Sequence, residues 1–297
     1  SVQKAGIENF SANIYKNTPE EPFNFQFMID AFATEKDTTV VKESNPLHIK
    51  VEELILKKGS LSYNILSAPH TPGKFNSNHI DVENFNFKGS ADFLNIEDMK
   101  ADVKLLTFME RNSDINLSRF EAGITGKGTQ LKSDGLIINL NSTDLEIPEA
   151  NYDTESEEFY VALRSNQLDP KDVAKFYTPL ESLDKLFAFE IEANGQLPGA
   201  NLKKLNLKYG TETEFDIVGS ISDYSNYDNS DMLVDIQRLS VSQSDLESII
   251  KVWATEYTSP VQLTALGDID LSLRSAGRMG RFSYNGDIDT EQGSVTD

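Results

Sequence analysis

The chain has 297 residues, 48 of them acidic and 27 basic, and its formal net charge of −21 disfavours both nucleic acid and anionic membrane surfaces as partners. It contains no cysteine, which rules out disulfides, zinc–thiolate sites and thiol nucleophiles. Hydrophobic residues make up 38% of the chain, as in folded proteins, but no apolar run reaches the roughly 18 residues that a membrane-spanning helix needs.

Residues 1–50 are interpreted as an N-terminal lead-in segment. They begin with "SVQKAGIENF", which lacks the apolar core of a signal peptide. The C-terminal "TEQGSVTD" stops abruptly after a strand-like run. We therefore expect the chain to be a piece of a longer protein, so that missing targeting signals say little about the parent.

The stretch "VEELILKKGSLSYNI", Val51–Ile65, predicts two short strands around a glycine turn. Leu54 and Leu56 share one face of an extended chain, and Leu61 and Tyr63 share the same face after the turn, because successive strand side chains alternate. The unit has one apolar face and no reactive group on either face.

The next segment contains two of the three histidines. His70 and His79 bracket "HTPGKFNSNH", and this interval could bring two imidazoles together across a loop. No third ligand stands at metal-site spacing, and Pro72 and Gly73 indicate a plain surface loop. We therefore expect no metal site here.

Alternation with a period of two recurs through the rest of the chain and predicts strands with one apolar and one polar face. In "FAFEIEANG", Phe187, Phe189 and Ile191 share one face. Turn signals such as "LPGAN" and "AGRMG" separate the strands. Further apolar positions at this spacing are Leu136, Ile138, Leu140, Leu205, Leu207, Phe215, Ile217, Ile269, Leu271 and Leu273.

Only two segments have helical spacing. The first is 169–187, broken at Pro179, and the second is 242–257, with Ser244 as the predicted N-cap. The fold predicted from these patterns is mainly β: an elongated, curved, antiparallel-rich sheet of groove-like repeats with one or two short helices.

The two helical segments also indicate a repeat. Asp172 in "LDPKDVAKF" and Asp245 in "VSQSDLESI" occupy matching places about 73 residues apart, and strands follow each. We read residues 51–167 as a β-rich module, 168–240 as a helix-plus-strands repeat and 241–297 as its second, truncated copy. A carboxylate at a helix start favours the helix dipole, which explains both aspartates without catalysis.

Aspartates gather in "SDYSNYDNSDMLVD", whose members are Asp223, Asp228, Asp231 and Asp235. They favour a solvated acidic loop, because the known twelve-residue calcium-loop pattern is missing. A weak calcium site in Asp223–Asp235 stays open as an alternative. Tyr224 and Tyr227 in this loop could stack on sugars. A glycan-binding β-domain, extracellular or periplasmic, is therefore the alternative function.

No motif of an enzyme is found. The chain lacks a nucleophile elbow, a phosphate-cradling loop and a dinucleotide fingerprint. A pair of the 48 carboxylates could act as in a glycosidase, but the sequence singles out none. We therefore expect no catalytic residue, no cofactor and no bound metal, with a carboxylate hydrolase as the weakest alternative.

The order of motifs in roughly Val51–Gly286 resembles AsmA-like proteins, in particular the TamB family of Bacteroidetes. The apolar hairpin at Val51 is similar to their recurring unit, as are "PGKFNSNHIDVENFNF" and "LNSTDLEIPEANYD" followed by "LDPKDVAKFYTPL". Their Glu-x-x-Ser-Gly turn has a counterpart here in Glu110 and Ser113. Asp114 replaces the usual glycine, which puts the geometry of that turn in question.

The resemblance implies a non-enzymatic periplasmic scaffold in the cell envelope of a Gram-negative bacterium, in a parent anchored in the inner membrane. Its cargo would be phospholipid acyl chains, nascent outer-membrane β-barrel proteins, or both, beside an Omp85-class barrel partner. A closed core between two sheets stays open as the alternative for the apolar faces. The residues expected to line the groove are Leu54, Leu56, Leu61, Tyr63, Phe187, Phe189, Ile191, Leu205, Leu207, Phe215 and Ile217.

Overall fold

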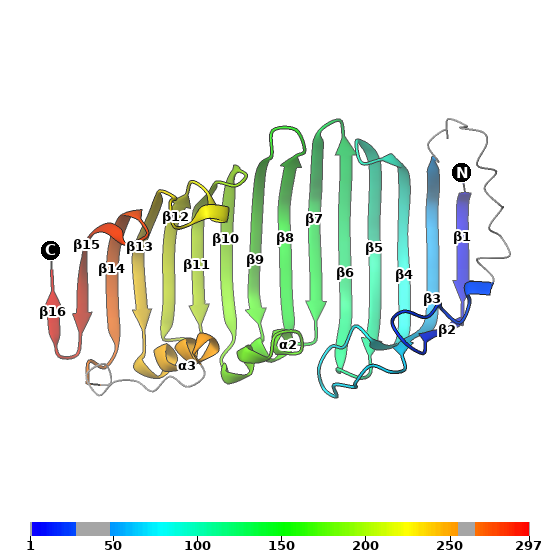
Figure 1. Cartoon of the computed structure of the whole chain (residues 1–297), viewed down its shortest axis with the longest axis horizontal. Coiled ribbons are helices and arrows are strands. Elements are labelled where there is room, and N and C mark those ends of the chain that lie inside the picture. The colour runs from blue at the N-terminus through cyan, green and yellow to red at the C-terminus, as the bar shows by residue number, and fades with distance from the viewer. Residues whose placement is uncertain (1, 28–47, 255–264, 297) are drawn as a thin grey trace. The chain divides into compact units, whose positions relative to one another are not determined.

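The computed structural model describes residues 2–27, 48–254 and 265–296, and it is mainly β (Figure 1). It divides into two compact units, Ser1–Lys127 and Gly128–Asp297, which we describe in turn. In each unit the strands form an open, antiparallel-rich sheet, and the second unit also contains the helical elements α2, η1, η2 and α3. The predicted fold class is confirmed. No helix in the described ranges is long and apolar enough to cross a membrane.

The sheet of unit 1 is built on long strands. Its two N-terminal strands pair with β3 in parallel, whereas β3 to β6 are antiparallel neighbours in chain order. Part of the N-terminal 50 residues is thus integrated into the sheet. The strands are β1 Val2–Glu8, β2 Ser11–Lys16, β3 Ile49–Ile65, β4 His79–Asn95, β5 Asp98–Glu110 and β6 Ile115–Lys127.

The predicted hairpin in Val51–Ile65 is wrong, because this stretch lies in the single strand β3. The lysine–glycine segment is a bulge: Lys58 has φ of 52°, and the register with β4 shifts on both sides of Gly59. The backbone N–H of Lys58 donates to Asn86 Oδ1 at 3.0 Å instead of to a ladder carbonyl. Since a bulge adds a residue without reversing the chain, Leu56 and Leu61 keep one face.

Gly59 is needed for a close contact and not for a turn. A Cβ built there would lie 2.2 Å from the ring of Phe10, which contacts Phe85 edge-on at 6.2 Å between ring centroids. The lead-in segment therefore covers part of the apolar face of β3.

The β5–β6 turn keeps its geometry without the usual glycine. Asp114 adopts φ of 54°, the left-handed conformation that Asp tolerates better than most residues. The carboxylate of Glu110 is 2% exposed and accepts hydrogen bonds from the backbone N–H groups of Asp81, Asn112 and Ser113 at 2.9, 3.2 and 2.8 Å. Burial raises the pKa of Glu110, but these bonds and the Ser113 hydroxyl outweigh it, so the pKa is lowered.

Within unit 2 the strands are antiparallel, and each pairs with its neighbours in chain order inside the unit. The turns predicted at "LPGAN" and "AGRMG" separate β10 from β11 and β14 from β15, as expected. The strands are β7 Gln130–Leu140, β8 Thr143–Asp153, β9 Glu158–Leu168, β10 Phe187–Gln196, β11 Ala200–Tyr209, β12 Thr213–Ile221, β13 Met232–Val241, β14 Ile269–Arg278, β15 Arg281–Thr290 and β16 Gly293–Val295.

Both helical segments are confirmed. The first contains α2, Pro170–Ala174, and the 3₁₀ turn η1, Thr178–Ser182, which begins one residue before the predicted break at Pro179. A second 3₁₀ turn, η2, covers Tyr224–Asn226. The second contains α3, Gln243–Trp253, and the last predicted residues, 255–257, lie outside the described residues. Its predicted N-cap is wrong: Ser242 has the extended backbone of a cap and accepts from Asp245 N at 3.3 Å, while Ser244 already lies inside the helix.

The aspartates of the two helices have equivalent tethers. Asp172 accepts from the hydroxyl of Thr143, the first residue of β8, at 2.9 Å. Asp245 accepts from the hydroxyl of Thr213, the first residue of β12, at 2.7 Å, and Lys185 Nζ lies 2.6 Å from its other oxygen. Both carboxylates are buried, at 4% and 2% exposure. Each ties its helix to the start of the strand that lies two strands earlier in the chain.

Candidate functional site

Two rows of apolar side chains cross the sheet of unit 2 from strand to strand. Directly opposed residues in neighbouring strands project from the same face of a sheet, so each row lies on one face. Sequence alternation puts both rows on the same face in β10, β11, β12 and β14, and a bulge between Ile236 and Leu239 has the same effect in β13. The first row is Leu163, Ile191, Leu205, Ile217, Ile236 and Leu273; the second is Phe189, Leu207, Phe215, Leu239, Leu271 and Ile288.

The opposite face of the same strands is charged and paired. Lys204 lies 2.5 Å from Glu190, and Glu214 lies 2.7 Å from Lys208 and 3.1 Å from Arg238. The hydrogen bond from Lys208, followed by its charge, lowers the pKa of Glu214. This face therefore carries solvated ion pairs, whereas the apolar rows have no such partners.

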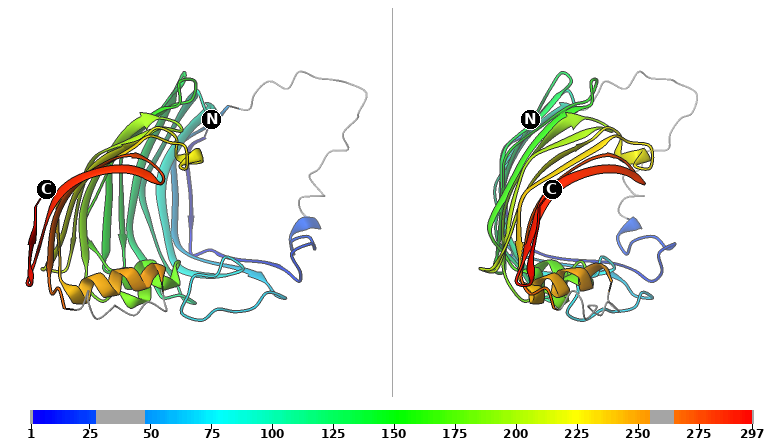
Figure 2. Two further views of the ribbon diagram at one scale, coloured as in Figure 1. Left: turned by 60° about the vertical axis from the view of Figure 1, so that its left-hand side comes forward. Right: turned by 90° about the vertical axis from the view of Figure 1, so that its left-hand side faces the viewer.

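The apolar rows are covered only in part. Every member except the more exposed Ile288 is intermediate in exposure, and none is fully buried. Among the described residues of unit 2, strands contact their sheet neighbours. The elements α2 and α3 lie at one end of the strands, and η2 lies at the other end (Figure 2). A sandwich partner would bury these side chains completely.

The helical segments close the end of the apolar face. Leu183, Tyr209 and Val252 are buried at 2%, 0% and 6% exposure and form a small core, with Phe187 and Ile249 packed against it. The hydroxyl of Tyr209 accepts from the backbone N–H of Asp184 at 3.1 Å, so its polar end is satisfied. We call this assembly of η1, the following loop and α3 the helical cap.

Two apolar hollows lie on this part of the unit. The cap pocket, between the helical cap and the strands, has a volume of about 220 Å³, and its lining includes Leu183, Phe187, Leu205, Leu207, Phe215 and Ile249. The far pocket, about 240 Å³, lies toward the other ends of β11 to β13, where Leu202, Ile217, Ile221, Met232 and Val234 contribute to its lining.

The structure brings together the seven expected groove residues of unit 2: Phe187 lies at the cap end of β10, and the other six lie in the two rows. The four from unit 1 lie on β3, where Leu54, Leu56, Leu61 and Tyr63 oppose Gly89, Phe87, Val82 and Ile80 of β4. All four are intermediate in exposure, and the ring of Tyr63 contacts Phe23 at 6.3 Å.

Sequence reasoning missed β13, because its aspartates suggested a loop. Asp235 lies within this strand, and Ile236 and Leu239 extend the two apolar rows. A register shift between Ile236 and Leu239 places three steps where strict alternation has two, so the period-two signal fails there. The signal in the sequence is that Met232, Val234 and Ile236 alternate, and that Leu239 and Val241 alternate again after one extra residue.

The acidic segment is distributed over separate structural roles. Asp223 accepts from the backbone N–H and hydroxyl of Ser225, and Asp231 pairs with Arg278 at 2.8 Å. In the described ranges, no three His, Asp or Glu side chains form a group that could hold a metal. Tyr224 and Tyr227 are both exposed to more than half.

His70 and His79 meet, but not as metal ligands. Their rings stack with centroids 3.7 Å apart. His79 is buried at the start of β4, and its two ring nitrogens lie 3.0 Å from Asn64 Oδ1 and 2.9 Å from the carbonyl oxygen of Ala68. The prediction of a plain surface loop is therefore wrong for His79, which anchors the loop to β3.

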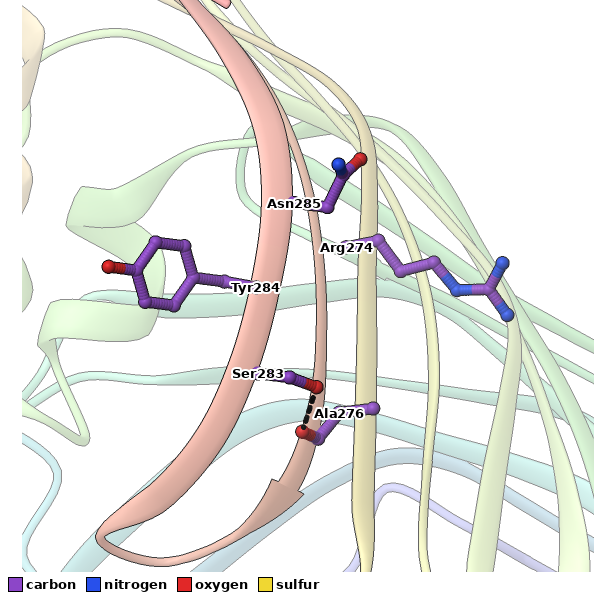
Figure 3. Close-up of a pocket in the computed structure, with 5 residues that line it drawn as sticks. All are labelled: Arg274, Ala276, Ser283, Tyr284 and Asn285. Atoms are coloured by element: carbon purple, nitrogen blue, oxygen red, sulfur yellow. Dashed lines mark hydrogen bonds between the residues drawn. The ribbon is translucent and has the colours of Figure 1, made fainter. Parts of the chain in front are cut away.

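A hollow of about 200 Å³ near the end of unit 2, lined by Arg274, Ala276, Ser283, Tyr284 and Asn285, does not form a convergent site. Tyr284 points to one side of its strand, whereas Arg274 and Asn285 point to the other (Figure 3). The hydroxyl of Ser283 donates to the carbonyl oxygen of Ala276 at 3.1 Å and is thereby occupied (Figure 3).

The geometry therefore singles out the apolar face of unit 2 and its two hollows. Comparison with protein-family models, with curated proteins and with solved structures gave no match for this chain.

Proposed function

We propose that the apolar face of unit 2 is a groove that holds the acyl chains of phospholipids, in a non-enzymatic scaffold for lipid passage between membranes or for outer-membrane protein assembly. The observation that carries the proposal is the pair of half-covered apolar rows, closed at one end by the helical cap. Hydrocarbon gains about 0.8 kcal/mol for each methylene it removes from water, without any directional contact.

Acyl chains fit this face better than a visiting β-strand does. A strand binds a sheet through free backbone groups at an edge, and specificity comes from side-chain pockets. The backbone groups of β10 to β14 are engaged in ladders with both neighbours, so this face offers side chains alone. Hydrocarbon requires nothing else, and it can slide because no hydrogen bond has to break.

The wider setting of the proposal follows from the resemblance to AsmA-like and TamB proteins. It is the periplasm of a Gram-negative bacterium, with a parent chain anchored in the inner membrane and an Omp85-class barrel as partner. The ion-paired opposite face supports this setting, because a charged outer surface keeps such a sheet in aqueous surroundings.

Site-specific photo-crosslinking tests the lipid assignment. The photoreactive residue p-benzoylphenylalanine replaces Leu207 in the apolar row or, as the matched control, its neighbour Lys208 on the opposite face. With phosphatidylethanolamine present during illumination, we expect a lipid adduct in mass spectrometry from position 207 and none from 208. Equal adducts from both positions, or none from either, would contradict the proposal.

A glycan-binding function has one observation in its favour, the exposure of Tyr224 and Tyr227. Exposed aromatic rings are suitable platforms for sugar rings. Glycan-array binding that disappears in the Tyr224→Ala, Tyr227→Ala double variant, together with no lipid adduct at position 207, would establish this alternative.

A further inference from the structure

The two apolar hollows of unit 2 belong to one track. Leu205 lines the cap pocket and Ile217 lines the far pocket, and these two residues are direct partners across β11 and β12. The track therefore runs along the strands, from the helical cap at one end to the far pocket at the other. It crosses the two apolar rows instead of following them.

The two ends of the track differ. At the cap end, the buried side chains of Leu183 and Val252 stand behind the pocket. At the far end, Gly219 has no side chain, and the polar turn that starts at Ser222 and contains Asp223, Ser225 and Asn226 follows β12. A terminal methyl group suits the apolar cap end, whereas a polar head suits the end at which polar groups lie.

The track is long enough to hold one lipid tail. From Phe215 in the cap pocket to Ile221 in the far pocket there are six residue steps, about 20 Å at roughly 3.3 Å per step. The hydrocarbon core of a bilayer is about 30 Å thick for two leaflets, so one tail spans about 15 Å. A complete tail is thus accommodated between the two hollows.

We propose that a single acyl chain lies parallel to β11, β12 and β13, with its methyl end in the cap pocket and its polar head beyond the far pocket. The inference rests on the proposed function and adds a direction and a length limit to it. The helical cap blocks the methyl end and thereby limits the length of acyl chain that the track can hold.

Lipids with a diazirine at either end of the tail test the orientation in the unaltered protein. The probes are palmitoyl lysophosphatidylethanolamines that carry the diazirine next to the terminal methyl or next to the ester, and the adducts are located by peptide mass spectrometry. We expect the methyl-end probe to label Leu183 or Ile249, and the ester-end probe to label Leu202 or Met232.

The reverse pattern, or equal labelling of both ends by both probes, would overturn the orientation while leaving the lipid-binding proposal in place. Absence of labelling anywhere on the apolar face would overturn both. The two failures are therefore distinguishable.

Filling the cap pocket tests the length limit. Ile249→Trp places a larger side chain in the pocket, and Lys251→Trp, on the exposed side of the same helix, is the control. Each excluded methylene weakens binding about fourfold, so the loss of two reduces the affinity for the palmitoyl lipid about 15-fold. The affinity for a capryl lipid stays unchanged, as do both affinities in the control. Equal weakening of the long and the short lipid would refute the length limit.

Discussion

Replacing Asp245 by alanine removes the side chain that ties α3 to the start of β12, and we expect this to loosen the helical cap. The hydroxyl of Thr213 is fully buried and loses the acceptor that lies 2.7 Å away. Leaving a buried polar group without a partner costs about 1–3 kcal/mol. Lys185 also loses its partner at 2.6 Å, but its side chain is 33% exposed and can turn to water, so this part is about 1 kcal/mol at most.

The expected total for Asp245→Ala is therefore about 1–4 kcal/mol of unfolding free energy for unit 2. Asp245→Asn keeps an acceptor for Thr213 and should cost about 1 kcal/mol. The hydrogen bond to Asp245, aided by its charge, raises the pKa of Lys185. A raised pKa means that the stabilisation is complete below the pKa of the unfolded lysine and is lost as pH rises through the folded value, so it is intact at neutral pH.

Urea denaturation combined with hydrogen exchange over α3 measures both effects. Glu247→Ala on the same helix is the control, since its contacts with Lys251 at 4.0 Å and with Gln243 at 2.9 Å are partly exposed pairs along the helix, each worth about 0.5 kcal/mol at most. If Asp245→Ala cost no more than this control, or left exchange in α3 unchanged, the tether would have no structural role and the reasoning would fail.

Two further predictions concern unit 1. Gly59→Ala should lower the melting temperature, at a cost of about 1–2 kcal/mol in unfolding free energy, because the new methyl group meets the ring of Phe10. The cost should be smaller in a Phe10→Ala background. An equal cost in both backgrounds would exclude this contact as the cause. Because the pKa of Glu110 is lowered in the folded state, its contribution to stability is complete above the unfolded pKa and is lost as pH falls through the folded value. In urea titrations, Glu110→Gln should therefore approach the stability of the unaltered protein on acidification, and a constant gap at all pH values would contradict this.

Alternation of apolar and polar residues was sufficient to predict the fold class and the strands β7, β10, β11, β12 and β14 of unit 2, and helical spacing predicted both helical segments. The positions from Phe187 to Ile217 were placed on a common face because strand side chains alternate whatever their tertiary setting. Alternation does not predict whether the backbone reverses direction at a glycine or continues in the same strand. The segment before Gly59 has the composition of a turn, yet cross-strand pairing with β4 holds it as a bulge within one strand.

The sequence by itself thus determined that the protein is mainly β, acidic and free of cysteine, and which side chains share a strand face. Only the tertiary structure decided which faces become one surface, because register and bulges depend on partners far away in the chain. It alone showed that Asp172 and Asp245 fasten helices to distant strands and that His79 is buried. It also placed the helical cap at one end of an apolar face, since the packing of Leu183 and Val252 around Tyr209 joins three separate segments.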